Sequence, residues 1–344
     1  MSPSVEVKLL PTDLDGAWDT FVRAHPEGTF FHLTGWREVL RRAFGHRTHY
    51  LVALAGGEVR GVLPLAEVKS FLFGHSLVST PFCVYGGIVA ADEAAKAALE
   101  AHACALAREL GVDYLEMRNR RRQHPEWPAK DLYVTFRKAI DADGEKNMLA
   151  IPRKQRAMVR KGIQKGLHAE IDARPDRLFA MYSESLRNLG TPVFSRRYLG
   201  ILQDVFGEDC EILTVMHEAA PVASVLSFYF RDEVLPYYGG GTRAARGVSG
   251  NDFMYWSVME RAREGGRRLF DYGRSKLGTG SYDFKTYWGF EPEPLHYEYF
   301  LVGRREMPNL SPTNPKYEAM IGIWRRLPVA LTRLIGPPVA KYLG

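Results

Sequence analysis

The sequence is poor in cysteine and lacks long apolar runs and metal-ligand patterns. Its three cysteines, Cys83, Cys104 and Cys210, are scattered and form no CxxC pair, which argues against a disulfide framework and a zinc site. No apolar run reaches the length of about 20 residues that spans a bilayer, and the first residues do not resemble a secretory signal. No Ser-His or Cys-His signature of a covalent nucleophile is present. We therefore expect a soluble protein of the cytoplasm that binds no metal.

Positive charge is concentrated in one segment. The 344 residues include 46 Lys and Arg against 40 Asp and Glu, a formal net charge of +6. Residues 118–165 alone hold 14 basic and 5 acidic side chains, so the rest of the chain is slightly acidic. A basic segment of this kind attracts phosphate-bearing partners, such as nucleic acid (tRNA among them), nucleotide sugars, coenzyme A or anionic lipid.

Two parts of the chain follow the same order of elements. In residues 43–63 and again in 205–226, a Phe-Gly pair precedes two short runs typical of strands. Each copy then reaches a Tyr-Gly-Gly triplet, a helix-length segment and a strand that closes on an acidic residue. These later elements are 85–87, 91–110 and 111–116 in the first copy, and 238–240, 251–265 and 266–271 in the second. The repeated order helix, strand, strand, strand, helix, strand predicts two mixed α/β (α+β) domains related by duplication.

The chain is expected to have three parts. An N-terminal domain spans 1–140, and a C-terminal domain spans 141–305 and opens with a basic helix at 151–167. The remaining tail, 306–344, mixes tryptophan, aliphatic residues and arginine, without an acidic residue after Glu318. Basic amphipathic helices that bear tryptophan can lie on an anionic membrane surface. The tail therefore predicts either peripheral binding at the inner membrane or packing against the globular body. The oligomeric state stays open.

Six separated motifs carry a resemblance to a known family. They lie at 30–36, 81–87, 151–156, 188–198, 237–242 and 283–285. In these motifs the chain resembles the FemAB family of tandem GNAT-fold acyltransferases, and within it the proteins found beside exosortase/PEP-CTERM and exopolysaccharide genes. The resemblance implies two GNAT-like domains with mixed sheets. It also implies an N-acyltransferase (EC 2.3 type) that moves an aminoacyl or acyl group onto an amine of a cell-envelope or exopolysaccharide precursor.

The acyl donor is a co-substrate whose identity the sequence leaves open. Residues 243–251 contain glycines, but not at the spacing of the usual GNAT pyrophosphate loop. FemAB enzymes that depend on tRNA often carry a long helical arm. The sequence contains no heptad-patterned insertion that would form such an arm. Aminoacyl-tRNA, acyl-CoA and acyl carrier protein all remain candidate donors. Two other functions remain open as well: an ordinary N-acetyltransferase dependent on acyl-CoA or an acyl carrier, and a non-catalytic adaptor that binds RNA or lipid.

Residues 270–290 join a strand end, a glycine-rich loop and a lysine among aromatic side chains. By the resemblance, Lys285 holds the acyl donor or stabilises the oxyanion of the tetrahedral intermediate, since a desolvated cation acts strongly where negative charge develops. Phe284 and Trp288 are expected to form the donor-binding wall beside it. The structural alternative is a surface lysine whose stem packs on Trp288.

Three further residues are candidates for catalysis. Asp271 and Asp283 flank the loop, and either carboxylate could take the proton from an attacking amine. Their structural alternatives are a strand-end cap for Asp271 and a turn or ion pair for Asp283. Tyr238 precedes Gly239 and Gly240, where bare backbone lets a ligand approach closely. A β-bulge explains these glycines nearly as well.

The basic helix is the candidate site for phosphate groups. Arg153, Arg156 and Arg160 recur near one helical face, and Lys154 adds to the charge. Guanidinium groups in a row suit a diphosphate or a nucleic-acid backbone, whereas the structural alternative is a solvated linker helix. Three more arginines are candidates for the same anion or for coenzyme A: Arg196, Arg197 and Arg246.

Overall fold

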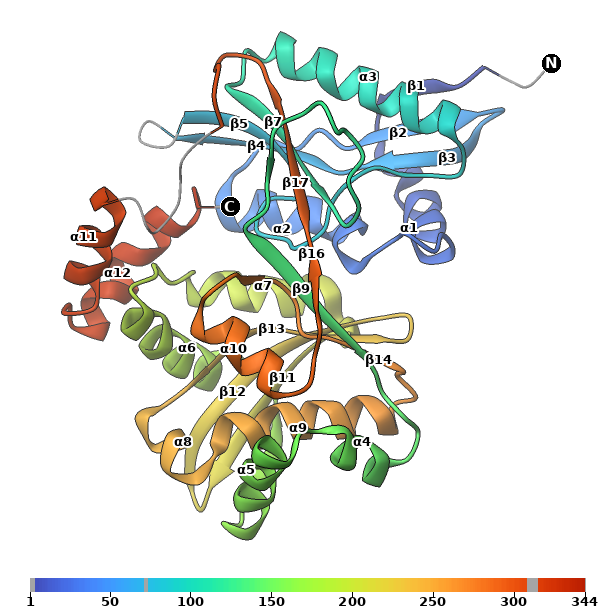
Figure 1. Ribbon diagram of the computed structural model, residues 1–344. Helices are drawn as coiled ribbons and strands as arrows, with labels where there is room; N and C mark the ends of the chain where they lie inside the picture. The colour runs from blue at the N-terminus through green and yellow to red at the C-terminus, as the bar shows by residue number, and fades with distance from the viewer. Residues whose placement is uncertain (1–3, 71–73, 308–314, 344) are drawn as a thin grey trace. The chain divides into compact units, whose positions relative to one another are not determined.

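The computed structural model describes residues 4–70, 74–307 and 315–343. The chain divides into two compact units (Figure 1). The first unit consists of Met1–Tyr133, Pro294–Pro308 and Tyr342–Gly344, and the second of Val134–Glu293 and Asn309–Lys341. This division differs from the predicted domains, because the segment after residue 294 forms a strand of the first unit rather than of the second.

The first unit holds two sheets. The four-stranded sheet has the order β1-β2-β3-β6 and the five-stranded sheet the order β4-β5-β7-β17-β8. The strands are β1 (Glu6–Leu9), β2 (Leu51–Ala55), β3 (Glu58–Leu63), β4 (Leu65–Ser70), β5 (Gly74–Ser79), β6 (Val89–Ala90), β7 (Tyr114–Asn119), β8 (Ala129–Lys130) and β17 (His296–Leu301). β5 and β7 are parallel, whereas β17 pairs antiparallel with both β7 and β8.

The helices of the first unit are η1 (Thr12–Leu14), α1 (Asp15–Ala24), η2 (Phe30–His32), α2 (Gly35–Phe44) and α3 (Glu93–Glu109). Asp92 caps α3 by accepting a hydrogen bond from the backbone N–H of Ala95 at 2.9 Å. The side chains of α3 that are buried against the sheet recur every four residues, which is the spacing of one helical face. They are Ala95, Leu99, Ala103 and Ala107.

The second unit is built on one mixed sheet of eight strands. Its order is β10-β11-β12-β13-β14-β9-β15, and β16 pairs with β9. The strands are β9 (Tyr133–Ala139), β10 (His168–Asp172), β11 (Cys210–His217), β12 (Ala220–Phe230), β13 (Glu233–Gly241), β14 (Leu269–Asp271), β15 (Ser275–Lys276) and β16 (Pro292–Pro294). Strands β10 to β13 are antiparallel neighbours, and β13 and β14 are parallel.

Helices cover both faces of this sheet, with α6 on one face of β12 and β13 and α9 on the other (Figure 1). β12 is accordingly buried along nearly its whole length, as expected for a strand covered on both sides. The helices are α4 (Gly144–Ala150), α5 (Arg153–Gln164), α6 (Asp176–Leu189), α7 (Arg196–Phe206), η3 (Gly207–Asp209), α8 (Arg243–Val248), α9 (Gly250–Glu264), α10 (Gly280–Tyr287), α11 (Pro315–Trp324) and α12 (Val329–Ala340).

Both units contain the same strand-helix-strand arrangement with a parallel strand pair. It consists of β5, α3 and β7 in the first unit and of β13, α9 and β14 in the second. The helices expected at 91–110 and 251–265 are confirmed as α3 and α9, and the basic helix as α5.

Two details of the predicted repeat are wrong. The first unit has an additional strand, because Pro64 separates β3 from β4 whereas β12 runs uninterrupted in the second unit. In addition, Tyr85-Gly86-Gly87 lies outside any strand, whereas residues 238–240 belong to β13.

Candidate active site

The parallel strands β13 and β14 stay together over only two residue pairs, Glu233 with Leu269 and Val234 with Phe270. β13 then continues as far as Gly241, while β14 ends at Asp271. Ligands of open α/β sheets bind outside the carboxyl ends of strands that part in this way. The candidate active site is therefore at the end of β14 and along the second half of β13.

Lys285 reaches the end of β14 from α10. Its Nζ donates hydrogen bonds to the carbonyl oxygens of Gly273 at 2.8 Å and Arg274 at 3.1 Å. The same atom lies 5.4 Å from the ring centroids of both Phe136 and Tyr272. The sequence predicted a flexible loop here, but residues 280–287 are helical, and this helix fixes the direction of the lysine. Lys285 is only 8% exposed, so the alternative of a surface lysine is wrong.

The surroundings of Lys285 change its protonation. Burial lowers the pKa of Lys285 to about 7, although the nearby Asp271 carboxylate acts in the opposite direction. At neutral pH a substantial share of the side chain is therefore an uncharged amine. Such an amine has two N–H groups and one lone pair. The carbonyls of Gly273 and Arg274 accept from the two N–H groups, so the lone pair is left to take up a proton.

Asp271 lies beside Lys285 but is fully enclosed by protein. Its Oδ1 accepts a hydrogen bond from the backbone N–H of Gly273 at 2.8 Å and from Thr135 Oγ1 at 3.4 Å. Its Oδ2 lies 3.2 Å from Arg137 Nε. The structure thus brings Asp271 and Lys285 together around Gly273, with Asp271 as the cap of the strand end. Asp283 instead is exposed in the first turn of α10.

Tyr238 belongs to an aromatic group between β13 and the helices α6 and α7. Its hydroxyl is hydrogen-bonded to that of Tyr198 at 2.8 Å, and its ring lies 5.7 Å from Tyr182. Gly240 is needed for packing, since a Cβ there would lie 2.8 Å from the carbonyl oxygen of Met181 on α6. The register of β12 against β13 also shifts next to Tyr238, so part of the glycine signal is the bulge considered from the sequence.

Trp288 is completely buried and joins three helices. Its Nε1 donates to Asp252 Oδ1 at 3.1 Å, and Gln155 Nε2 donates to the same oxygen at 2.5 Å. Burial raises the pKa of Asp252, and these two hydrogen bonds act in the opposite direction. Asp252 was missed in the sequence, where an acidic residue in the first turn of a helix was its only signal.

Phe284 is half-buried, with its ring 5.7 Å from that of Tyr255.

Asp252→Ala is expected to lower the free energy of unfolding of the second unit by about 2 kcal/mol, because the Gln155 amide and the Trp288 indole N–H would remain buried without an acceptor. Urea unfolding followed by tryptophan fluorescence measures this change. Asp252→Asn is the control, since it keeps an acceptor oxygen in place and should lose less. An equal loss in both variants would show that these hydrogen bonds are not the cause.

The basic side chains of α5 are presented to solvent. Arg153, Lys154 and Arg160 are exposed, whereas Arg156 is half-buried and donates to the carbonyl oxygen of Leu149 at 3.0 Å. The opposite face of α5 is buried against α9. The expected row of cations is therefore available to an anionic partner.

The other three candidate arginines lie on different helices. Arg196 forms an ion pair with Asp176, so part of its charge is already neutralised. Arg197, also on α7, and Arg246, on α8, are exposed.

The N-terminus of α9 fits a coenzyme A diphosphate poorly. Gly250 is buried there, and a Cβ on it would lie 3.1 Å from Ala245 Cβ of α8. The first turn also carries the Asp252 carboxylate. A diphosphate needs open backbone N–H groups and positive potential. Here Ala245 of α8 packs on Gly250, and the first turn holds an acidic residue whose carboxyl group is bonded to Gln155 and Trp288.

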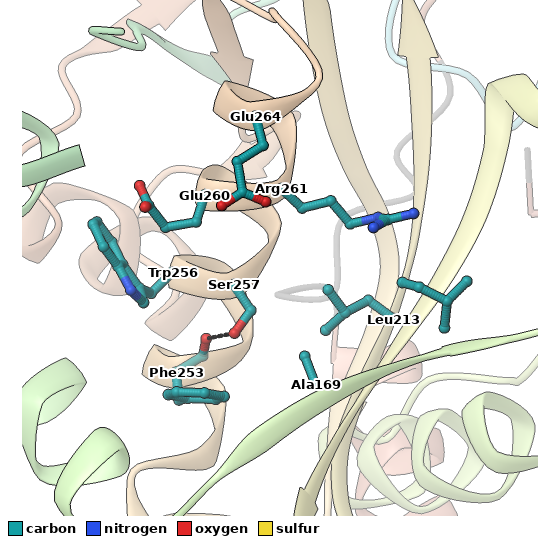
Figure 2. Close-up of a pocket in the computed structure, with 9 residues that line it drawn as sticks. Ala169, Leu213, Phe253, Trp256, Ser257, Glu260, Arg261 and Glu264 are labelled. Carbon is teal, nitrogen blue, oxygen red and sulfur yellow. Dashed lines mark hydrogen bonds between the residues drawn. The ribbon is translucent and has the colours of Figure 1, made fainter. Parts of the chain in front are cut away.

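A separate cavity of about 280 Å³ lies between α9 and the strands β10 and β11, of which β10 is at the edge of the sheet. Figure 2 shows Ser257 and Arg261 on the side of α9 that faces Leu213, whereas Trp256 and Glu260 extend from the other side of the helix in this view. None of the predicted site residues lines this cavity. The cavity is thus separate from the candidate active site around Lys285 at the end of β14.

Among residues 4–70, 74–307 and 315–343, no group of three or more His, Cys, Asp and Glu side chains is placed to hold a metal ion. In the same ranges no helix combines the length and the apolar character needed to cross a bilayer.

A family model described as acetyltransferase (GNAT) domain matches residues 153–286. The matched residues lie within the second unit, which is thus similar to a GNAT acetyltransferase domain. This match covers α5, the parting strands β13 and β14, and Lys285 on α10. The expectation of an acyltransferase enzyme is thereby confirmed. A comparison with curated proteins finds no match.

Solved structures with low sequence identity share the fold. The crystal structure of FemX is 15% identical, covers 92% of this chain and 100% of its own, and has a TM-score of 0.66. A tandem GNAT protein from the clavulanic acid biosynthesis pathway is 14% identical over 88% of this chain and 100% of its own, at a TM-score of 0.56. The C-terminal domain of a putative lysylphosphatidylglycerol synthetase from Agrobacterium fabrum is 14% identical. The match covers 90% of this chain and 94% of that domain, with a TM-score of 0.55. The expected tandem GNAT-like fold with mixed sheets is confirmed.

Proposed function

We propose that this acyltransferase moves an aminoacyl group from a charged tRNA onto an amine of a cell-envelope or exopolysaccharide precursor in the cytoplasm. The observation that carries the proposal is Lys285, a buried lysine with a pKa of about 7 beside the parting strands of the GNAT domain. The resemblance to the FemAB family supports the aminoacyl group and the type of acceptor.

In the proposed reaction the acceptor amine attacks the acyl carbonyl directly. A C–N bond forms, the amine loses a proton to the lone pair of Lys285, and the tetrahedral intermediate collapses with cleavage of the ester bond to the donor. The proton then passes to the departing oxygen. A base with a pKa near the working pH is efficient in such a step. The negative charge of Asp271 favours the protonated form of Lys285 and so limits how far burial lowers the pKa of the lysine.

The choice of donor rests on two features of the second unit. The covered N-terminus of α9, with Asp252 in its first turn, disfavours the diphosphate of coenzyme A. The exposed cations of α5 suit the repeated phosphates of an RNA backbone. The match to an acetyltransferase domain favours acyl-CoA as the second candidate donor, with an acyl carrier protein as its variant.

The triple variant Arg153→Ala, Arg156→Ala, Arg160→Ala is expected to bind charged tRNA at least about tenfold more weakly than the unaltered protein, because three phosphate contacts are lost. Fluorescence anisotropy measures the tRNA affinity, and calorimetry with acetyl-CoA is run in parallel. The control is Lys8→Ala, which removes a cation from β1 of the first unit.

The outcome separates the donors. Binding of acetyl-CoA that ignores the three arginines, without binding of tRNA, would contradict the proposal and assign the protein to the acyl-CoA-dependent class. Binding of neither would also contradict it, and transfer would then have to start from a carrier protein or a lipid-linked acyl group.

A further inference from the structure

The C-terminal helix α12 packs on the second unit with one face. On α12 the buried residues are Thr332, Gly336 and Ala340, which recur every four positions. The contact is close, since a Cβ on Gly336 would lie 3.0 Å from the backbone of Val193. Arg333 Nε adds a hydrogen bond to Ser183 Oγ of α6 at 2.7 Å. α12 (red in Figure 1) is therefore held beside α6 as a folded part of this unit.

The other face of α12 is apolar and open. Leu331, Leu334, Ile335 and Pro338 are all exposed, Leu334 to 73%. Their spacing of i, i+3, i+4 and i+7 defines one continuous stripe along the helix. α11 presents exposed apolar side chains as well, and Ile323 there is 64% exposed. A helix packed by one face normally turns polar groups outward, so an outward apolar stripe indicates a surface that is covered in use.

The charged residues of α12 and of the turn before it are all basic, although Glu318 lies within α11. From residue 320 to the last residue the chain contains four basic residues and no acidic one. Arg325 and Arg326 are exposed at the end of α11, next to the apolar side chains. The basic residues are Arg325, Arg326, Arg333 and Lys341.

We propose that α11 and α12 form a docking surface for an anionic lipid bilayer. The apolar stripe would enter the boundary between headgroups and acyl chains, while the exposed Arg325 and Arg326 contact anionic headgroups. Charge complementarity selects this partner: a second copy of the chain would bring the same positive residues together, whereas an anionic bilayer neutralises them. The surface does not include Lys285 or α5, so this inference holds or fails independently of the proposed donor and reaction.

The test is flotation of the full-length protein with two kinds of vesicle, phosphatidylcholine alone and phosphatidylcholine with phosphatidylglycerol in equal parts. We expect binding to the anionic vesicles and at least about tenfold weaker partition for the double variant Ile323→Glu, Leu334→Glu. Arg326→Glu is expected to weaken binding in a salt-dependent way. All three side chains are exposed, so folding should not change. Leu9→Glu, at another exposed apolar position, is the matched control.

Three results would overturn the inference. One is equal binding to both kinds of vesicle, since the arginines would then have no part. Another is anionic binding that the glutamate variants leave unchanged, because the surface would then lie elsewhere. The third is concentration-dependent dimerisation that the double variant abolishes without any vesicle binding, which would assign the stripe to a second copy of the chain.

Discussion

Replacing Lys285 by methionine is expected to lower the rate of acyl transfer by about 100-fold or more, because the reaction loses the group that takes the proton from the attacking amine. Methionine fills a similar volume among the same aromatic rings, so the fold should be kept. The rate is measured as transfer of a labelled acyl group from the donor that binds in calorimetry. With Lys285 in place, the rate should rise as the pH increases through about 7, where the lysine loses its proton.

Lys285→Arg decides between the two roles that the lysine could have. Arginine stays charged throughout and cannot accept the proton, but it still supplies a positive charge. We expect this variant to be as inactive as Lys285→Met. Substantial activity in Lys285→Arg would mean that the charge matters, as the oxyanion role predicts, and that another group removes the proton.

The same substitution should alter how stability depends on pH. Below about pH 7 Lys285 is protonated in both the folded and the unfolded chain, and the whole penalty of burying its charge is present. Between about 7 and the ordinary value of 10.5 the unfolded chain binds the proton and the folded chain does not, so stability rises with pH. The Lys285→Met variant lacks this rise. Urea unfolding of both proteins across this range measures the difference.

Glu298→Ala is expected to lower the free energy of unfolding of the first unit by about 3 kcal/mol. Glu298 lies on β17 and has no exposed surface. Its carboxylate accepts hydrogen bonds from the backbone N–H of His124 at 2.8 Å, the backbone N–H of Gln123 at 3.1 Å and Asn119 Nδ2 at 2.5 Å. Alanine would leave the His124 N–H and the Asn119 amide buried without this acceptor. Arg122 lies 3.5 Å from the carboxylate, is exposed and keeps its hydrogen bonds to the carbonyl oxygens of Pro125 and Trp127.

Hydrogen exchange at the amides of Gln123 and His124 reports this loss locally, and urea unfolding reports it for the unit. Glu291→Ala is the matched control, because that carboxylate is exposed and its removal should change little. If both variants lose the same stability, the buried network is not what holds β17 in place.

Much of the fold follows from local sequence patterns. The helices α3, α5 and α9 and the strands β2, β3, β11 and β12 were all expected near their observed positions, because each has the periodicity or residue preference of its type. α10 was missed because glycines at 278 and 280 indicate a loop, although its apolar side chains pack on the core. The pairing of β17 with β7 could not be predicted, since its partners are far apart in the sequence.

The candidate site shows the same limit. Lys285 was identified from its aromatic neighbours in the sequence, but the rings nearest to its Nζ, Phe136 and Tyr272, come from other elements. Trp288 was expected to face a ligand and instead is buried on Asp252. Such contacts depend on tertiary packing, which local patterns do not contain.

The position of β17 at the far end of the chain has a consequence for biosynthesis. As the polypeptide leaves the ribosome, residues 1–133 emerge first but lack the strand that joins β7 to β8. The strands of the other sheet, from β9 to β16, have all emerged by residue 294. The five-stranded sheet of the first unit is therefore completed after the sheet of the second unit, and until residue 301 appears β7 has an unpaired edge. A chaperone that shields strand edges would act on the nascent chain during this interval.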